Sequence, residues 1–300
     1  AKERIGHLYP DATIVGERTG KKSVAKTSAG VWARTVVCPN PACGIEMPLV
    51  GSWWLGKKQG KEAYVVPSVV DDASVPSGRR VHFTIGHDRL KGPAGAVDGT
   101  MSGRTGGLCV ACGSVALSDY IKSEGTAGRL GATLMAVVAE GDRRRIYTQP
   151  TDEHRRAAAV DRPDRIPTQK LAHDPRNLWT PAYGLTKFSD LFTDRQLVAL
   201  ATFSDLVGEA RSKVIEDAIA SGLSPDARLV DGGTGAEAYA DAVATYLGII
   251  VSRLADYQSS ITTWASNPQM EILRNAFARQ AIPMTWGFAE GNPFGPSSGT

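Results

Sequence analysis

The pattern of hydrophobic positions changes partway along the chain. Between residues 31 and 150, apolar residues come in short stretches bounded by Gly, Pro, Asp or Ser, which is typical of β-strands. A polar, basic segment over 1–30 precedes them, and we expect it to be a tail and an exposed loop. The chain thus begins with a β-rich module over 31–150, with strands predicted at 31–38, 46–58, 62–70, 79–86, 132–140 and 145–150.

Beyond the strand-like stretches, the pattern first loses its order and then becomes helical. Residues 151–180 contain prolines and mixed charges, and we interpret them as a linker. Residues 181–300 are predicted to be a helical region. Thr193 and Gln196 have the spacing of a capping box at its start, and Gly222 marks the end of the first helix.

Two further helices are predicted in the same region. Thr234 and Glu237 have the spacing of a second capping box, which would open a helix running to about Trp264 with an apolar buried face. A third, shorter helix is expected from Asn267 to about Gln280. The sequence DGGTG at 231–235 superficially resembles a cofactor-binding glycine loop, but no buried strand precedes it, so a helix start is the favoured interpretation.

Composition is that of an ordinary globular protein. The chain of 300 residues is 42% hydrophobic and 22% charged, with a net charge of +3, which does not by itself indicate nucleic acid. No apolar run is long enough to span a bilayer, and the first residues lack the apolar core of a secretory signal. We expect a cytoplasmic protein. The missing initiator methionine and the ending GNPFGPSSGT suggest a piece of a longer chain.

The chemistry of the sequence is concentrated in its four cysteines. Cys38 and Cys43 lie in CPNPACG, Cys109 and Cys112 lie in CVACG, and a glycine follows each pair. Two such knuckles supply four thiolates, enough for a tetrahedral zinc site with no open position for catalysis. We therefore predict structural zinc, with two disulfides or free buried thiols as the alternatives. Free cysteines and zinc fit a reducing compartment.

Two basic stretches are candidates for contact with nucleic acid. In the strand carrying Trp53 and Trp54, one indole must face away from the other, and lysines follow. Indoles can stack on bases, and basic side chains can contact phosphates. The alternative is that the tryptophans fill a core and the charges are only solvated. The candidate residues are Trp54, Lys57, Lys58, Lys61, Arg143, Arg144 and Arg145.

Several long stretches together resemble the adenine-specific DNA methylases that carry an internal zinc ribbon. The resemblance covers nearly the whole chain and includes both cysteine knuckles. The stretches that carry it are RIGHLYP, VWARTVVCPNPACGIEMPLV, WWLGKKQGKEAYV, SDYIKSEGTAGRLGATLMAVVAEG, LFTDRQLVALATFSDLV, AYADAVATYLGIIVSRLADY and NAFARQAIPMTWGFAEGNPF.

This resemblance implies a parent enzyme that transfers a methyl group from S-adenosylmethionine to N6 of adenine in DNA. In the family, a glycine-rich cofactor motif lies upstream of the matched region and a D-P-P-Y catalytic motif lies downstream. Neither occurs here, so we name no catalytic or cofactor-binding residue and expect this chain alone to be inactive. Only the four cysteines carry over as site residues.

The expected fold class is α+β. It comprises a β-rich zinc-ribbon module with a β insertion and then a helical region, inserted in or flanked by an α/β methyltransferase fold. The expected partners are DNA and the flanking parts of the same methylase, and the expected role is DNA binding or target recognition. The alternatives are a stand-alone, non-catalytic zinc-ribbon module that binds nucleic acid or protein, and a degenerate gene remnant.

Overall fold

The computed structural model describes residues 1–15, 20–88, 99–102, 105–141 and 144–295, which form a mixed α and β fold. An antiparallel sheet with the order β12-β11-β3-β15 lies at its centre, and β4 pairs with the C-terminal end of β3. These strands are β3 (Thr27–Val37), β4 (Glu46–Leu49), β11 (Gly131–Gly141), β12 (Arg144–Thr148) and β15 (Gly287–Gly291). Ten of the eleven residues of β3 are at least partly shielded from solvent, so structure must cover both of its faces.

Two smaller sheets cover those faces. Ala29, Val31 and Ala33 of β3 belong to the core shared with the sheet β5-β6-β7, whereas Trp32 packs with the hairpin β1-β2 on the other side. This alternation follows from the two-residue period of a strand. The covering strands are β1 (Ala12–Val15), β2 (Lys22–Ala25), β5 (Trp54–Gly56), β6 (Ala63–Asp71) and β7 (Arg79–Gly86).

The remaining short elements lie around this body. A third small sheet of β8 (Met101–Ser102), β9 (Gly106–Leu108) and β10 (Val115–Leu117) leads into the helix α2 (Ser118–Thr126). The other short elements are α1 (Lys2–Ile5), η1 (Gly6–Leu8), α3 (Asp152–Ala158), η2 (Thr180–Tyr183), η3 (Phe188–Leu191) and η4 (Leu229–Asp231). The predicted strands at 62–70 and 79–86 and the hairpin at 132–150 are therefore confirmed. The single strand predicted over 46–58 is wrong, because the chain there divides into β4, which pairs with β3, and β5, which pairs with β6.

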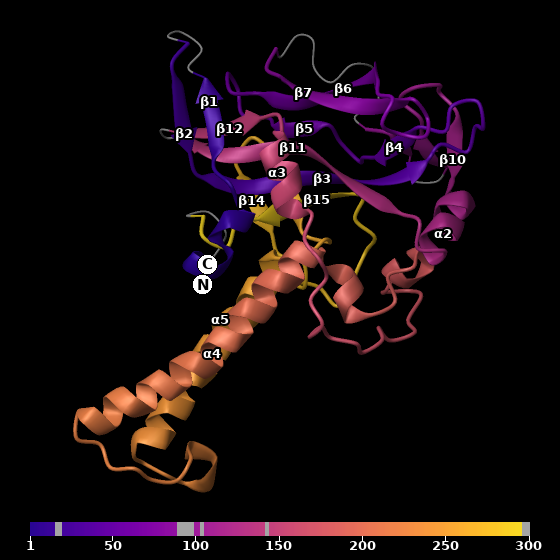
Figure 1. The fold of residues 1–300 in the computed structure, drawn as a ribbon. Helices are drawn as coiled ribbons and strands as arrows, with labels where there is room; N and C mark the ends of the chain where they lie inside the picture. Colours follow the sequence, from indigo (N-terminus) through magenta and orange to yellow (C-terminus); the bar gives the residue numbers. More distant parts are fainter. Residues whose placement is uncertain (16–19, 89–98, 103–104, 142–143, 296–300) are drawn as a thin grey trace.

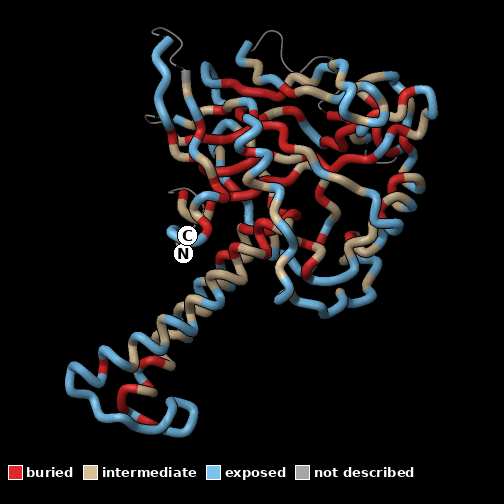
Figure 2. The backbone as a smooth tube through the Cα atoms, in the orientation of Figure 1, coloured by how far each residue is buried: buried red, intermediate tan, exposed pale blue. Residues whose placement is uncertain are grey.

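Two long helices project from the β body as an antiparallel hairpin (Figure 1). They are α4 (Asp194–Ala220) and α5 (Ala236–Tyr257). The capping box predicted for the first helix is confirmed, because the Thr193 hydroxyl accepts from the Gln196 N–H and the Gln196 side chain accepts from the Thr193 N–H. The middle of the hairpin is mostly intermediate or exposed, and buried residues lie at both of its ends (Figure 2). No described helix is both long and apolar enough to cross a membrane.

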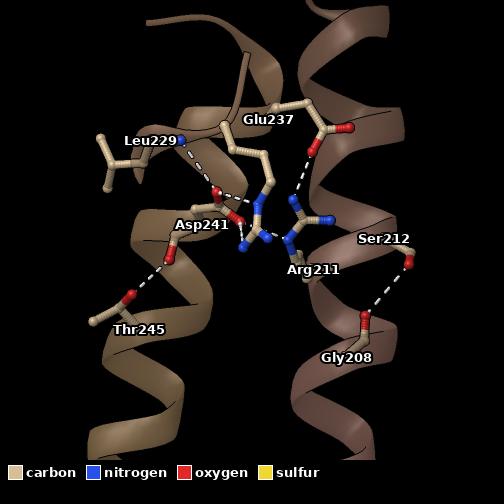
Figure 3. A network of polar contacts seen from close by, with 8 residues as sticks. Gly208, Arg211, Ser212, Leu229, Glu237, Asp241 and Thr245 are labelled. Carbon is tan, nitrogen blue, oxygen red and sulfur yellow. Dashed lines mark hydrogen bonds and ion pairs between the residues drawn. The ribbon is translucent and has the colours of Figure 1, made fainter. Parts of the chain in front are cut away.

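An ion-pair network holds the far part of the hairpin together (Figure 3). Arg211 of α4 donates to Glu237 over 2.5 Å and to Asp241 over 2.7 Å, both on α5. Arg228 and the N–H of Leu229, from the connecting loop, also donate to Asp241. The hydrogen bonds from Arg211 and then from Arg228 lower the pKa of Asp241 to about 2. These contacts join the two helices and their connecting loop next to the buried alanines Ala236, Ala238 and Ala240 of α5.

The second capping box is wrong as predicted. Gly235 is the N-cap of α5 without a side-chain cap bond, and the Thr234 hydroxyl contacts Asp226 instead. The helix ends at Tyr257 rather than near Trp264. Its predicted buried face is also partly wrong, since Tyr239, Tyr246 and Ile250 are 56%, 72% and 56% exposed.

The third predicted helix, 267–280, is also wrong. The chain there forms a β hairpin of β13 (Thr263–Ser266) and β14 (Glu271–Arg274). The side chain of Asn267 accepts from the N–H groups of Gln269 and Met270, which makes a tight turn between the two strands. The described part of 181–300, up to residue 295, therefore holds three strands in addition to the helices, and the last of them, β15, belongs to the central sheet.

The first thirty residues also differ from the expected tail and loop. They contain α1, η1 and the hairpin β1-β2, and Ile5, Leu8 and Tyr9 are buried against α4. The stretch over 151–180 contains α3 and otherwise lacks long elements, and its Leu171 and Leu178 pack against a small core that includes Ile282.

A buried ion pair joins α4 to the central sheet. Arg195, in the first turn of α4, donates to both carboxylate oxygens of Glu290 in β15, over 2.9 and 2.6 Å. It also donates to the carbonyl of Leu8 over 2.8 Å and lies 5.0 Å from the centre of the Tyr9 ring. The two charged side chains are only 7% and 1% exposed. One guanidinium therefore ties together the N-terminal turn, the helical hairpin and the sheet.

Removing one partner of this pair leaves a buried charge without compensation. We expect Arg195→Met to lower the free energy of unfolding by about 3–5 kcal/mol in a denaturant titration. The matched control is Arg4→Met, which breaks an equally bidentate pair with Glu209 whose two side chains are each 52% exposed. The control should unfold close to wild type. Equal losses in the two variants would contradict the role given to Arg195.

Candidate metal centre

Each cysteine knuckle is the turn of a β hairpin. The first lies between the paired strands β3 and β4, and the Cys38 N–H donates to the carbonyl of Ile45 over 2.8 Å. The second lies between β9 and β10, and the Cys109 N–H donates to the carbonyl of Ser114 over 2.9 Å. The glycines after the two pairs, Gly44 and Gly113, have φ values of +56° and +73°. Only glycine adopts this backbone readily, which explains its position in both motifs.

The two turns bring the four cysteines to one point. The Sγ atoms of Cys38 and Cys112 are 3.6 Å apart, and those of Cys43 and Cys109 are 3.9 Å apart. All four sulfur atoms lie within 4.8 Å of one another, and all four thiols are free. A tetrahedron with metal–sulfur bonds of about 2.3 Å has sulfur atoms about 3.8 Å apart. The observed separations fit such a site.

The cluster is embedded in a core of its own. Cys38, Cys43 and Cys109 are buried, and Cys112 is exposed at the edge. Hydrophobic residues from β3, β4, β10 and α2 surround the sulfur atoms, namely Val36, Ile45, Met47, Leu49, Ala116 and Ile121. The metal site therefore has an apolar side that excludes water and an open side at Cys112.

The two sides of the site act differently on the thiols. Burial raises the pKa of Cys38, because a thiolate there would lose its hydration. Hydrogen bonds from the side chain and the backbone N–H of Ser114 lower the pKa of Cys112 to about 6. A bound cation compensates the buried thiolates directly. Since four thiolates complete a tetrahedral site, the arrangement suits a metal with a structural role.

Two polar residues near the sulfur atoms were not predicted from the sequence. The Asn40 side chain donates to the Ser114 hydroxyl over 3.3 Å and points toward the Cys112 sulfur at 3.9 Å. It also accepts from the Ala42 N–H over 3.0 Å, which closes the first turn. Asn40 thus links the two knuckles. The only signal in the sequence was a polar residue inside the first motif. Among the described residues, the four cysteines are the only group placed to hold a metal.

The tryptophan and lysine candidates are divided between core and surface. Trp53 is buried in the main core beside Phe83, so it cannot stack on a base. Trp54 is half-buried, and the Lys57 Nζ atom lies 5.5 Å from the centre of its ring. Lys57, Lys58 and Lys61 are all exposed in the turn between β5 and β6. This part of the candidate set forms one accessible basic loop.

The arginine candidates are less uniform. Arg143 lies outside the described residues. Arg144 is exposed at the start of β12. Arg145 makes an ion pair with Glu140 and donates to the Ser28 hydroxyl over 3.4 Å, so its side chain is held against the protein. Arg144 remains the more accessible of the two described arginines.

Comparison of the chain with models of protein families, with curated proteins and with solved structures finds no match.

If all four cysteines bind one metal ion, an exposed and a buried cysteine should contribute equally to metal binding and to stability. We expect Cys112→Ser and Cys43→Ser each to lower bound metal from about one ion per chain to a small fraction, measured by elemental analysis after dialysis against a weak chelator. Unfolding free energy should fall by several kcal/mol in both, because structural zinc contributes about 10–16 kcal/mol in small zinc-finger peptides.

The control is Val115→Ser, which changes a 48% exposed residue three positions from Cys112. It should retain metal and stability. If Cys112→Ser kept full stability while Cys43→Ser lost it, the thiols would be acting through burial alone and the metal centre would be wrong.

Proposed function

We propose that this chain is the central zinc-ribbon and helical segment of an S-adenosylmethionine-dependent, adenine-specific DNA methyltransferase, where it contributes DNA binding or target recognition. The observation that carries the proposal is the convergence of the two cysteine knuckles on one centre. The long stretches that resemble zinc-ribbon methylases include both knuckles. This role agrees with a site that has no open coordination position.

Zinc is the metal that we propose for the centre. Cys38, Cys43, Cys109 and Cys112 would hold it, and four thiolates in a tetrahedral arrangement are typical ligands of structural zinc. When bound, the ion supplies a cross-link and positive charge, and it takes no part in methyl transfer. Its effect is to fix the surface formed by the two knuckles and the strands that they join.

The basic loop between β5 and β6 is the part that we propose to contact duplex DNA. Lys57, Lys58 and Lys61 are exposed, and no ion pair involving them is found among the described residues. Lysines in this state can replace counterions on phosphates, which gives salt-dependent binding without sequence readout. The stem of this loop is anchored, because β6 pairs along its whole length with β7.

Methyl transfer itself is assigned to parts of the parent enzyme beyond this chain. The proposal therefore expects no transfer to adenine from the 300 residues alone and transfer from a longer chain that contains the glycine-rich and D-P-P-Y motifs. A stand-alone binding module would show DNA or protein binding but no activity in either form. Radiolabel transfer from S-adenosylmethionine to duplex DNA separates the two.

Removal of the three lysines tests the DNA contact. The variant Lys57→Ala/Lys58→Ala/Lys61→Ala should bind duplex DNA at least tenfold more weakly at low salt. The slope of log affinity against log salt should become shallower by about 2 to 3, because each phosphate contact contributes about 0.9. Fluorescence anisotropy at several salt concentrations measures both quantities.

The matched control removes three exposed lysines elsewhere, as Lys2→Ala/Lys22→Ala/Lys213→Ala. It has the same net charge as the test variant but retains the three lysines of the loop. It should therefore keep most of the affinity for duplex DNA and most of the slope of log affinity against log salt. An unchanged affinity and slope in the loop variant would refute DNA contact by the β5–β6 loop.

A further inference from the structure

Two neighbouring cavities share part of their lining, and we consider them together as one groove. The first, about 590 Å³, lies between α2, the segment 172–183 and the chain before β15. The second, about 410 Å³, lies between β5, β13 and the same chain before β15. Met284 and Trp286 line both cavities. We name this the aromatic groove and define it by Trp54, Trp179, Tyr183, Trp264, Met284 and Trp286.

The groove is built where two distant segments of the chain meet. Leu178 and Ile282 form a parallel bridge. The Trp179 N–H donates to the Ile282 carbonyl over 3.1 Å, and the Ile282 N–H donates to the Asn177 carbonyl over 2.7 Å. The short helix η2 then packs against α2, which follows the second cysteine knuckle (Figure 1). The walls of the groove are thus set by backbone contacts rather than by side chains alone.

Two of the tryptophans in the groove have their indole N–H groups satisfied by the protein. The Trp179 indole N–H donates to the Arg176 carbonyl over 3.0 Å, although the side chain is 52% exposed. The Trp264 indole N–H donates to the Leu55 carbonyl over 2.8 Å. Tyr183 and Trp286 meet edge to face with centres 4.9 Å apart. Trp179 and Trp264 therefore have no free N–H to offer a ligand, and stacking on a ring face is the contact that remains to them.

Positive charge lies at both ends of the groove. At one end, the Lys57 ammonium lies over the Trp54 ring. At the other end, Lys122 lines the first cavity and makes an ion pair with Asp119, whose side chain is 94% exposed. Asp174 also lines this cavity. Its carboxylate accepts hydrogen bonds from the Asn177 side chain and the Arg176 N–H, so these oxygen atoms are engaged within the turn that contains them.

We propose that the aromatic groove binds unpaired nucleotides of a DNA strand. Bases stack on Trp54, Trp286 and Trp179, and phosphates approach Lys57 and Lys122. Aromatic platforms combined with a cationic path are the means by which proteins hold single strands without regard to sequence. A small planar molecule would fill one cavity only, whereas a strand occupies both cavities and reaches both cations.

The inference rests on the proposed function in taking DNA as the ligand, and it adds a second site for a different state of that ligand. The basic loop contacts paired DNA, and the groove holds nucleotides that have left the duplex. An enzyme that modifies a base must take that base or its neighbours out of the stack. The shared residue between the two sites is Lys57, at the junction of loop and groove.

The test uses the full chain and a fluorescein-labelled oligothymidylate of fifteen nucleotides, with a fifteen-base-pair duplex as a second ligand. We expect Trp179→Ala to weaken single-strand binding by about five- to a hundredfold, the range for loss of one stacking platform. Trp179→Phe should restore part of the affinity because a ring remains. Binding of the duplex should change little in either variant.

Tyr246→Ala is the control, since it removes a 72% exposed aromatic ring from α5, and it should bind the oligonucleotide like wild type. Thermal unfolding of each variant verifies that the fold is intact. Trp54→Ala, at the other end of the groove, provides an independent second variant. Wild-type affinity for the single strand in both tryptophan variants would overturn the inference, as would an absence of single-strand binding by the wild-type protein.

The two proposals fail separately. Duplex binding that depends on the three lysines, together with single-strand binding that ignores Trp179 and Trp54, overturns the groove and leaves the proposed function standing. Single-strand binding that depends on Trp179, without any duplex binding, supports the groove and counts against the proposed function.

Discussion

The meeting of two β hairpins at four sulfur atoms is the contact on which the rest of the described body depends. Sixty-five residues separate Cys43 from Cys109, and this segment includes the strands β4 to β9. Closing so long a loop costs conformational entropy, which a metal bound to all four thiolates can offset. The hydrophobic residues around the cluster shield three of the four sulfur atoms, so a metal bound there would be held within an apolar core.

A second constraint joins this module to the C-terminal part of the chain. Strand β3 leads into the first knuckle and also pairs with β15, while Arg195 holds Glu290 of β15 against the start of α4. Arg34 of β3 donates to the carbonyls of Thr285 and Ser260 from within the core. The segment just before β15 is therefore fixed on both sides, and it forms the shared wall of the aromatic groove. Metal site, basic loop and groove thus belong to one continuous framework.

The sequence predicts the features whose signals are local. The cysteine knuckles, the strands of the β insertion and the capping box at Thr193 each depend on residues close together in the chain. The structure confirms the strands over 62–70 and 79–86 and the capping box. Asn267 shows why local signals are not sufficient, because an asparagine can either cap a helix or close a hairpin turn. Here it closes a turn, since Trp264 pairs with Leu273 across two antiparallel strands. The groove had no local signal, since it requires the bridge between Leu178 and Ile282.

The central claim is that four thiolates hold one structural zinc ion, and X-ray absorption at the zinc edge tests it most directly. The purified protein should contain about one zinc ion per chain, with four sulfur ligands at about 2.3 Å and no nitrogen or oxygen ligand. Protein that folds fully without metal, or a spectrum with fewer than four sulfur ligands, would contradict the account.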